Sequence, residues 1–200
     1  MALSDSPRKP RLLGISGSPR RGGNTDRLLN EAVAGAASKG AQVKHIILDD
    51  LEITPCQHCD GCIQTGGRCV VEDDMQWIHA DLREFDRVIL ASPVFFMGVT
   101  AQAKAMIDRC QALWVIKHLL KLPVGLGKDF PRKGAFISVG GTNYSTLFAG
   151  SIATVKSWFK TIEIDYAGEL LLPGMDHYGA VTEHPDALKQ AFLLGQQLAG

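Results

Sequence analysis

The chain has 200 residues, 46% of them hydrophobic, and its 21 basic side chains balance its 21 acidic ones. This length and apolar content predict one compact globular domain and exclude an intrinsically disordered chain. Because the net charge is zero, the sequence has no overall positive field that would recruit nucleic acid or an anionic membrane surface.

The N-terminal stretch Met1–Pro10 is polar and lacks the apolar segment of a signal peptide, so a flexible tail is predicted over residues 1–10. The longest apolar stretch, Val88–Val99, is interrupted by Pro93 and is too short to span a membrane. Four of the five cysteines lie within fourteen residues, which in an intracellular protein indicates metal or redox chemistry rather than disulfides. We therefore expect a cytoplasmic protein.

The stretch Gly14–Asp26 is rich in glycine and short polar side chains, and it follows a predicted buried strand over Leu12–Ile15. Apolar residues at helical spacing predict the first helix over 28–36, before Gly40. A helix that begins after such a turn offers unpaired N–H groups and a partial positive charge to a phosphate. Phosphate binding is therefore predicted, with charge supplied by Arg20 or Arg21, although a glycine-rich turn without a ligand is the alternative.

The rest of the chain continues to alternate between strand and helix patterns. Residues 55–71 interrupt this order, because they lack apolar periodicity and are predicted to form an irregular insertion. Five strands separated by helices indicate an α/β fold with a doubly wound parallel sheet. The other strands are predicted over 42–48, 87–92, 133–140 and 162–172, and the other helices over 75–85, 101–113 with an extension through Ile116 and Leu120, 147–159 and 185–198.

Three segments that follow predicted strands, 16–25, 92–100 and 140–145, do not look like ordinary turns. In doubly wound sheets, ligands bind beyond the carboxyl ends of the strands, where these segments would meet. The large apolar side chains of 93–98 predict a wall for a flat heteroaromatic ring, whereas a loop folded back onto the core is the alternative. The glycines after the fourth strand would let a ligand approach from the other side.

Several motifs carry a family resemblance: Gly14-Ile-Ser-Gly-Ser-Pro-Arg-x-x-Gly-Asn-Thr25, Ala91-Ser-Pro-Val-Phe-Phe-x-Gly98, and Lys104 with Ile107-Asp-Arg109. Together they resemble the FMN-binding flavoproteins of the NADPH-dependent FMN reductase type, over about residues 11–150. The resemblance implies one flavodoxin-like domain over 11–200, with a five-stranded sheet of order 2-1-3-4-5. It also implies FMN contacts from Ser16, Ser18, Pro19, Arg20, Asn24 and Thr25 to the phosphate, from Pro93, Val94, Phe95, Phe96 and Gly98 to the isoalloxazine ring, and from Gly140, Gly141 and Thr142.

The cysteines of the insertion follow the pattern Cys56-x-x-Cys59-x-x-Cys62-x6-Cys69. The two-residue intervals resemble the compact ferredoxin arrangement. Within the family, the insertion resembles that of the iron–sulfur flavoprotein branch, which implies a [4Fe–4S] cluster bound by all four cysteines. Zinc and metal-free thiols are the alternatives, since zinc also binds four thiolates. Cys110 is expected to be a buried small hydrophobic side chain.

We expect an FMN-dependent oxidoreductase that passes electrons between NAD(P)H or ferredoxin, FMN and the cluster, with no catalytic side chain. The alternatives are a cluster-free NAD(P)H-dependent flavin or quinone reductase and an electron carrier that catalyses nothing alone. The resemblance also implies a homodimer or homotetramer in which a neighbouring subunit completes the site. Asp108 and Arg109 are expected to form an ion pair at the helix surface or at a subunit interface.

Overall fold

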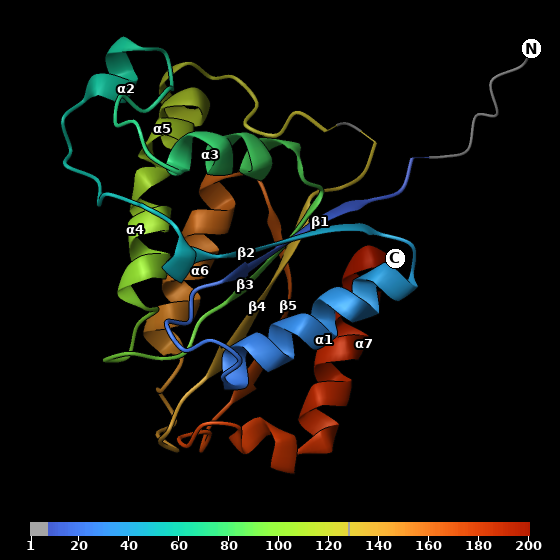
Figure 1. The fold of residues 1–200 in the computed structure, drawn as a ribbon. Helices are drawn as coiled ribbons and strands as arrows, with labels where there is room; N and C mark the ends of the chain where they lie inside the picture. Colours follow the sequence, from blue (N-terminus) through green and yellow to red (C-terminus); the bar gives the residue numbers. More distant parts are fainter. Residues whose placement is uncertain (1–7, 128) are drawn as a thin grey trace, which may run out of the picture.

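A sheet of five parallel strands forms the centre of the molecule (Figure 1), in a computed structural model that describes residues 8–127 and 129–200. The strand order is β2-β1-β3-β4-β5, which confirms the predicted doubly wound, flavodoxin-like topology. Every neighbouring pair is parallel. The strands are β1 (Arg11–Ser16), β2 (Gln42–Ile47), β3 (Arg87–Ala91), β4 (Lys133–Val139) and β5 (Asp165–Leu172).

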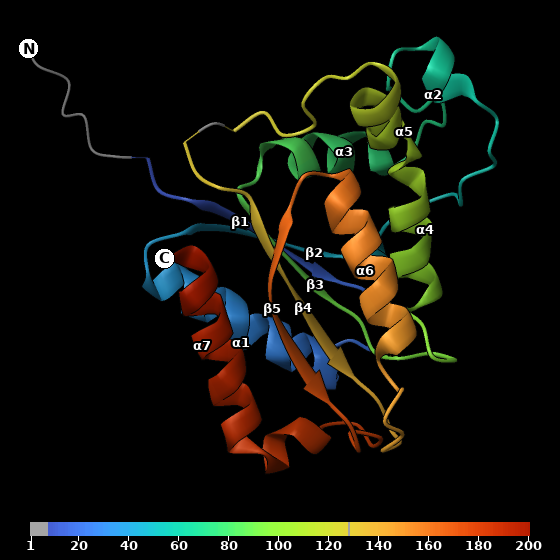
Figure 2. The same ribbon diagram turned by 180° about the vertical axis from the view of Figure 1, so that it is seen from behind.

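Helices cover both faces of the sheet, as the two opposite views show (Figures 1 and 2). Successive residues of β1 and β3 point to opposite faces, so Leu12 and Ile89 join one apolar core while Leu13 and Val88 join the other. Both faces of these central strands are therefore buried, which accounts for the continuous apolar sequence of β3. The first core is covered by α1 (Asn24–Ser38) and α7 (Pro185–Ala199), and the second by α3 (Met75–Glu84), α4 (Ala101–Arg109) and α6 (Ala149–Thr161).

Two glycines allow the backbones of α1 and α7 to touch. A Cβ atom on Gly195 would lie 1.8 Å from the carbonyl oxygen of Ala32, and one on Gly35 would lie 2.0 Å from that of Phe192. Both distances are far below van der Waals contact, and the atoms that would clash belong to rigid helix backbone. The contact thus fixes the position of α1, whose N-terminus lies at the carboxyl end of β1.

The helix predicted over 101–113 is interrupted, and the prediction was wrong in this detail. Helix α4 ends at Arg109, α5 spans Gln111–Trp114, and a π-helical turn spans Val115–Leu119. The apolar spacing continues across the breaks because Leu113 and Ile116 bury their side chains in the same core as the α4 residues. Strand β5 begins three residues later than predicted, since α6 continues to Thr161 and Glu163 follows with a left-handed φ of 59°. Short 3-10 helices occur at Leu48–Asp50 and Ala180–Glu183.

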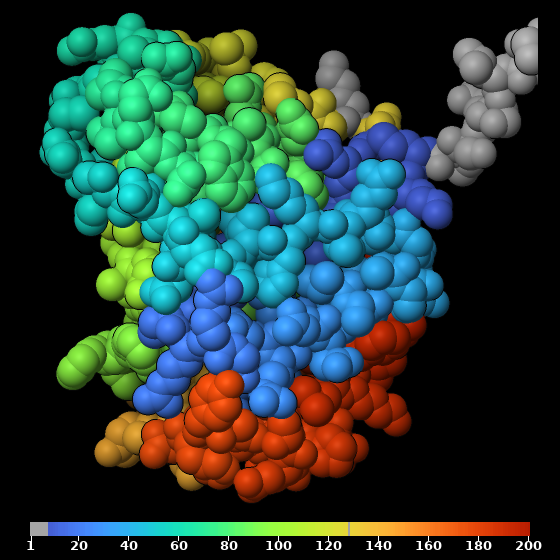
Figure 3. Space-filling view, viewed as in Figure 1, coloured from blue at the N-terminus to red at the C-terminus, as the bar shows by residue number. Residues whose placement is uncertain are grey.

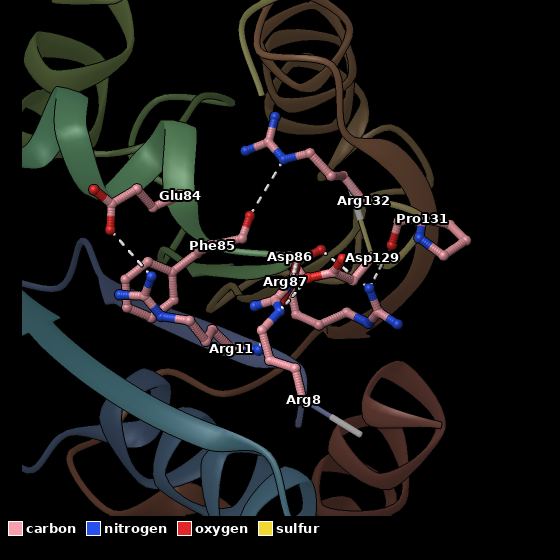
Figure 4. Close-up of polar contacts among 9 residues, drawn as sticks. All are labelled: Arg8, Arg11, Glu84, Phe85, Asp86, Arg87, Asp129, Pro131 and Arg132. Atoms are coloured by element: carbon pink, nitrogen blue, oxygen red, sulfur yellow. Dashed lines mark hydrogen bonds and ion pairs between the residues drawn. The ribbon is translucent and has the colours of Figure 1, made fainter. Parts of the chain in front are cut away.

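A polar cluster surrounds Asp86 at the amino end of β3 (Figure 4). The carboxylate of Asp86 is fully buried and accepts hydrogen bonds from the Arg8 guanidinium, at 2.8 and 3.1 Å, and from the Arg11 backbone N–H at 2.9 Å. The hydrogen bonds that Arg8 donates to Asp86 hold the pKa of Arg8 above its ordinary value. Residues 1–7 of the predicted tail lie outside the described residues, whereas Arg8 is anchored to the domain.

Among the helices of the described residues, none combines the length and apolar character needed to cross a membrane.

Candidate functional site

A cleft with about 600 Å³ of empty space, partly open to solvent, lies at the carboxyl ends of β1, β3 and β4. The three segments predicted to meet at this edge all contribute to it. The loop after β5 also lines the cleft, although its sequence gave no signal of such a role. The lining residues that were predicted are Ser18, Pro19, Arg20, Asn24, Thr25, Pro93, Val94, Phe95, Gly140 and Gly141, and those that were missed are Gly23, Val139, Met175, Asp176 and Tyr178.

Four residues predicted as cofactor contacts do not line this cleft: Ser16, Phe96, Gly98 and Thr142. Ser16 is fully buried and donates its hydroxyl to Asp26 Oδ1 at 2.5 Å. The second oxygen of this carboxylate accepts the backbone N–H of Gly22 at 2.9 Å. Ser16 and Asp26 therefore hold the shape of the loop between β1 and α1.

Asn24 connects this loop to the segment after β5. Its amide donates to the carbonyl oxygen of His177 at 2.9 Å, and its side-chain oxygen accepts the backbone N–H of Val181 at 3.2 Å. Of the two arginines proposed to add charge, Arg20 lines the cleft, whereas Arg21 forms an ion pair with Asp50. The groups available to a phosphate include the backbone N–H groups at the start of α1 and the side chains of Arg20 and Thr25, which line the cleft.

A tight turn at 95–98 forms an apolar rim beside the cleft and protrudes from the molecule (Figures 1 and 3). Phe95 and Gly98 exchange two backbone hydrogen bonds of 2.9 and 3.0 Å. Between them, Phe96 and Met97 adopt left-handed φ angles of 48° and 64°, which strains residues of this size and is common at ligand sites. The Phe96 side chain is fully exposed, so the tip of the loop does not fold back onto the core.

Thr100 joins two walls of the cleft. Its buried hydroxyl donates to the carbonyl oxygen of Gly17 at 2.6 Å and accepts the backbone N–H of Ala103 at 3.3 Å, which caps α4. Its own N–H donates to the Ser92 hydroxyl at 3.1 Å. The loops after β1 and β3 are thereby held in one arrangement.

Replacing Thr100 with valine, which has nearly the same shape, is expected to lower the free energy of unfolding by about 2–4 kcal/mol, because the cap is lost and the Gly17 carbonyl is left buried without a partner. The affinity for FMN, the ligand that the family resemblance implies for this cleft, should fall about tenfold as the two loops separate. Urea unfolding and quenching of flavin fluorescence measure the two effects. The matched control is Thr154→Val, since the Thr154 hydroxyl bonds only to its own helix at Gly150. Equal behaviour of the two variants would refute the role assigned to Thr100.

A second pocket, with about 350 Å³ of empty space, is lined by all four cysteines of the insertion. We call it the cysteine pocket; it consists of Cys56, Cys59, Cys62, Cys69 and their neighbours Gln57, His58, Asp60, Val71, Arg109 and Gln111. The insertion was predicted to be irregular, and this is wrong for Gly61–Gln64, which form the single helical turn α2. Asp60 and His58 before it adopt left-handed φ angles of 58° and 51°.

The thiols of the cysteine pocket form no disulfides, and burial raises the pKa of Cys62. No group of three or more histidine, cysteine or acidic side chains in residues 8–127 and 129–200 is arranged to hold a single metal ion. Even so, four cysteines that line one pocket are residues of the type that binds an iron–sulfur cluster or zinc. Cys110 lies apart in the core, as predicted, where burial raises its pKa to about 12 and Trp158 Nε1 donates to its sulfur at 3.3 Å.

Arg109 is the polar residue that sequence reasoning placed wrongly. It does not pair with Asp108, which instead binds Lys104 at 2.7 Å on the exposed side of α4. The Arg109 side chain is 1% exposed and forms a forked ion pair with Asp73, with distances of 2.5 and 3.0 Å. Asp73 is 36 residues away in sequence, so no local pattern could reveal the pair.

The guanidinium of Arg109 also holds both ends of the insertion. It donates to the carbonyl oxygens of Thr54 at 2.7 Å and Val71 at 3.2 Å. Burial alone would lower the pKa of Arg109, but the hydrogen bonds that Arg109 donates to Asp73, with smaller contributions from Cys69, raise it above its ordinary value. Beside it, His79 Nε2 lies 3.0 Å from the Arg109 carbonyl oxygen, and burial lowers the pKa of His79 to about 4.

The two sites lie at opposite ends of the sheet. In Figure 1 the loops after β3 and β4 lie at the lower end, while α2 and α5 lie at the upper end. The space-filling view shows the insertion at one upper corner of the surface (Figure 3). Helix α4 connects the ends, from its cap at Thr100 to Arg109, and its nine residues span about 13 Å.

Comparisons with known proteins agree with this geometry. Residues 10–151 match the family model described as NADPH-dependent FMN reductase. An iron-sulfur flavoprotein of Methanosarcina thermophila is 31% identical over 175 residues, which cover 88% of this chain and 83% of the relative. An iron-sulfur flavoprotein of Methanocaldococcus jannaschii is 43% identical over 103 residues, about half of each chain. The solved NAD(P)H:quinone oxidoreductase from Methanothermobacter marburgensis shares the fold, with a TM-score of 0.71 at 16% identity, over 96% of this chain and all of the other.

Proposed function

Because the chain belongs to the NADPH-dependent FMN reductase family and is thus a flavin-dependent oxidoreductase, we propose that it exchanges electrons between NAD(P)H or a reduced ferredoxin, FMN and a [4Fe–4S] cluster. The observation that carries the proposal is the presence, in one chain, of a cleft at the strand ends and of a pocket lined by four cysteines. Two pockets of such different chemistry fit two different redox groups.

The cleft would hold FMN. The backbone N–H groups that begin α1, together with Arg20, would bind its phosphate, because a helix N-terminus favours a dianion. Pro93, Val94 and Phe95 would form the wall against the ring, and Gly140 and Gly141 would line the other side. Bound FMN supplies hydride and single-electron transfer, and the chain supplies binding, orientation and exclusion of water.

The cysteine pocket would hold the cluster through Cys56, Cys59, Cys62 and Cys69. A cluster of this type supplies one-electron transfer at a potential set by its charge, hydrogen bonds and exposure. The names of the two similar archaeal proteins support this assignment over zinc or metal-free thiols.

We also propose that the protein acts in the cytoplasm as a homodimer or homotetramer. The exposure of Phe95, Phe96 and Met97 at the rim of the cleft supports association there, since clustered apolar side chains are commonly covered by a partner.

The proposal predicts that protein purified without oxygen carries FMN, iron and sulfide, with about four iron atoms and four cysteine ligands per chain. Replacing the four cysteines of the pocket with serine should remove the iron and sulfide while FMN remains bound. The control Cys110→Ser should keep both, because Cys110 lies in the core. Metal analysis, absorption spectra and NADPH oxidation are the measurements.

Each result separates the proposal from its alternatives. Iron-free wild-type protein would refute the cluster, and zinc in its place would identify a structural site. Unchanged NADPH–quinone turnover in the folded four-serine variant would favour a cluster-free reductase. Flavin reduced by ferredoxin but never by NAD(P)H would favour an electron carrier.

A further inference from the structure

Arg109, one of the residues that line the cysteine pocket, has a buried polar atom without a hydrogen-bond partner. Its Nε is one of two buried side-chain nitrogen or oxygen atoms without a hydrogen-bond partner in the described residues, the other being the hydroxyl of Ser151. The two terminal nitrogens of the same guanidinium bind Asp73, Thr54 and Val71. A buried N–H without a partner is costly, so its presence beside a pocket indicates a ligand that completes the bond.

Arg109 also brings a positive charge that cannot move away from the pocket. Its side chain is 1% exposed, and its terminal nitrogens are fixed by Asp73, Thr54 and Val71. Asp73 offsets part of this charge, while His79 stays neutral because burial lowers its pKa to about 4. Arg109, a residue that lines the pocket, therefore supplies a positive charge for an anionic occupant.

We propose that Arg109 is a positioning residue for the metal centre, whose fixed charge stabilises the reduced state of the thiolate-bound cluster and raises its reduction potential. The inference rests on the proposed [4Fe–4S] cluster. Four thiolates give such a cluster a net negative charge, and reduction adds one more electron. A cation in a poorly solvated pocket stabilises the more negative state, because Coulomb interactions are stronger there than in water.

A purely structural role for Arg109, as a clamp on Thr54 and Val71, makes a different prediction. A clamp would change how much cluster is bound, whereas the proposed charge changes the potential of the cluster that is bound. The double variant Arg109→Gln/Asp73→Asn removes the cation without leaving Asp73 buried as an unpaired anion. Lys104→Gln is the matched control, because it removes one positive charge from the same helix at an exposed position.

The experiment is a redox titration of anaerobically purified protein, followed by EPR of the reduced cluster and by iron and sulfide analysis of each sample. We expect the double variant to lose about tenfold in the equilibrium constant for reduction, a fall of about 59 mV for a one-electron couple. The Lys104→Gln control should match the wild type. If the equilibrium constant for reduction of the cluster-loaded double variant differs less than threefold from the wild-type value, the inference is overturned.

The variant Arg109→Lys provides a second test, which is needed if the double variant binds no cluster. Lysine keeps the charge but cannot reproduce the fork. If the cluster-loaded lysine variant has an equilibrium constant for reduction within threefold of the wild-type value, the charge has the proposed role. A larger fall in this constant, or a variant that takes up no cluster, assigns Arg109 to loop packing alone. Wild-type protein without iron would instead refute the cluster itself, so the two failures are distinguishable.

Discussion

Replacing Gly195 with alanine is expected to lower the free energy of unfolding by about 3 kcal/mol or more, although alanine favours helix by about 1 kcal/mol over glycine. The added Cβ would lie 1.8 Å from the Ala32 carbonyl oxygen, an atom of helix backbone that cannot turn aside. The helices α1 and α7 must then separate, which moves the start of α1 at the cleft. Urea denaturation and FMN affinity measure the two consequences.

Gln197→Ala is the control for this substitution. Gln197 is an exposed residue of the same helix, so its replacement should change stability by no more than about 0.5 kcal/mol. An alanine variant at Gly195 that is as stable as the wild type would show that α1 and α7 are not packed backbone to backbone.

Replacing Asp73 with alanine is expected to cost about 3–5 kcal/mol, because it leaves the buried Arg109 charge without its partner. The loss should extend to the insertion, since Asp73 also accepts the backbone N–H groups of Thr54 at 3.0 Å and Met75 at 3.1 Å. Chemical denaturation gives the free energy, and hydrogen exchange of residues 54–71 reports the loosening of the insertion.

The exposed pair on α4 supplies the comparison. Asp108→Ala breaks the ion pair with Lys104, in which both side chains are about half exposed, and should cost about 0.5 kcal/mol or less. If both aspartate variants lose equally little, the Asp73–Arg109 pair contributes nothing beyond a surface ion pair.

The sheet and the place of the cleft could be predicted from the sequence because both depend on local patterns. Continuous apolar residues such as those of β3 identify a strand buried on both faces, and parallel strands bring their carboxyl ends to one edge. The turns after β1, β3 and β4 therefore had to meet. The glycines and apolar residues in those turns then indicated a ligand.

The roles of individual polar residues could not be predicted in the same way. Ser16 and Asn24 are residue types that suit a phosphate site, but their hydrogen bonds go to Asp26, His177 and Val181. Short polar side chains serve equally well to bind a ligand or to fix a loop, and composition does not separate the two. The segment from Met175 to Tyr178 carries no motif, and its place in the cleft follows from the length and direction of β5.

Helix α4 has a dipole that points along the line between the cleft and the cysteine pocket. Aligned peptide dipoles place a partial positive charge at its amino end, beside the cleft, and a partial negative charge at its carboxyl end, beside the cysteine pocket. An added electron is thus favoured near the cleft and disfavoured near the pocket, by about 0.3–1 kcal/mol at each end. Arg109, in the last turn, opposes this bias at the pocket. The helix and its terminal arginine together set how evenly two redox groups at its ends would share an electron.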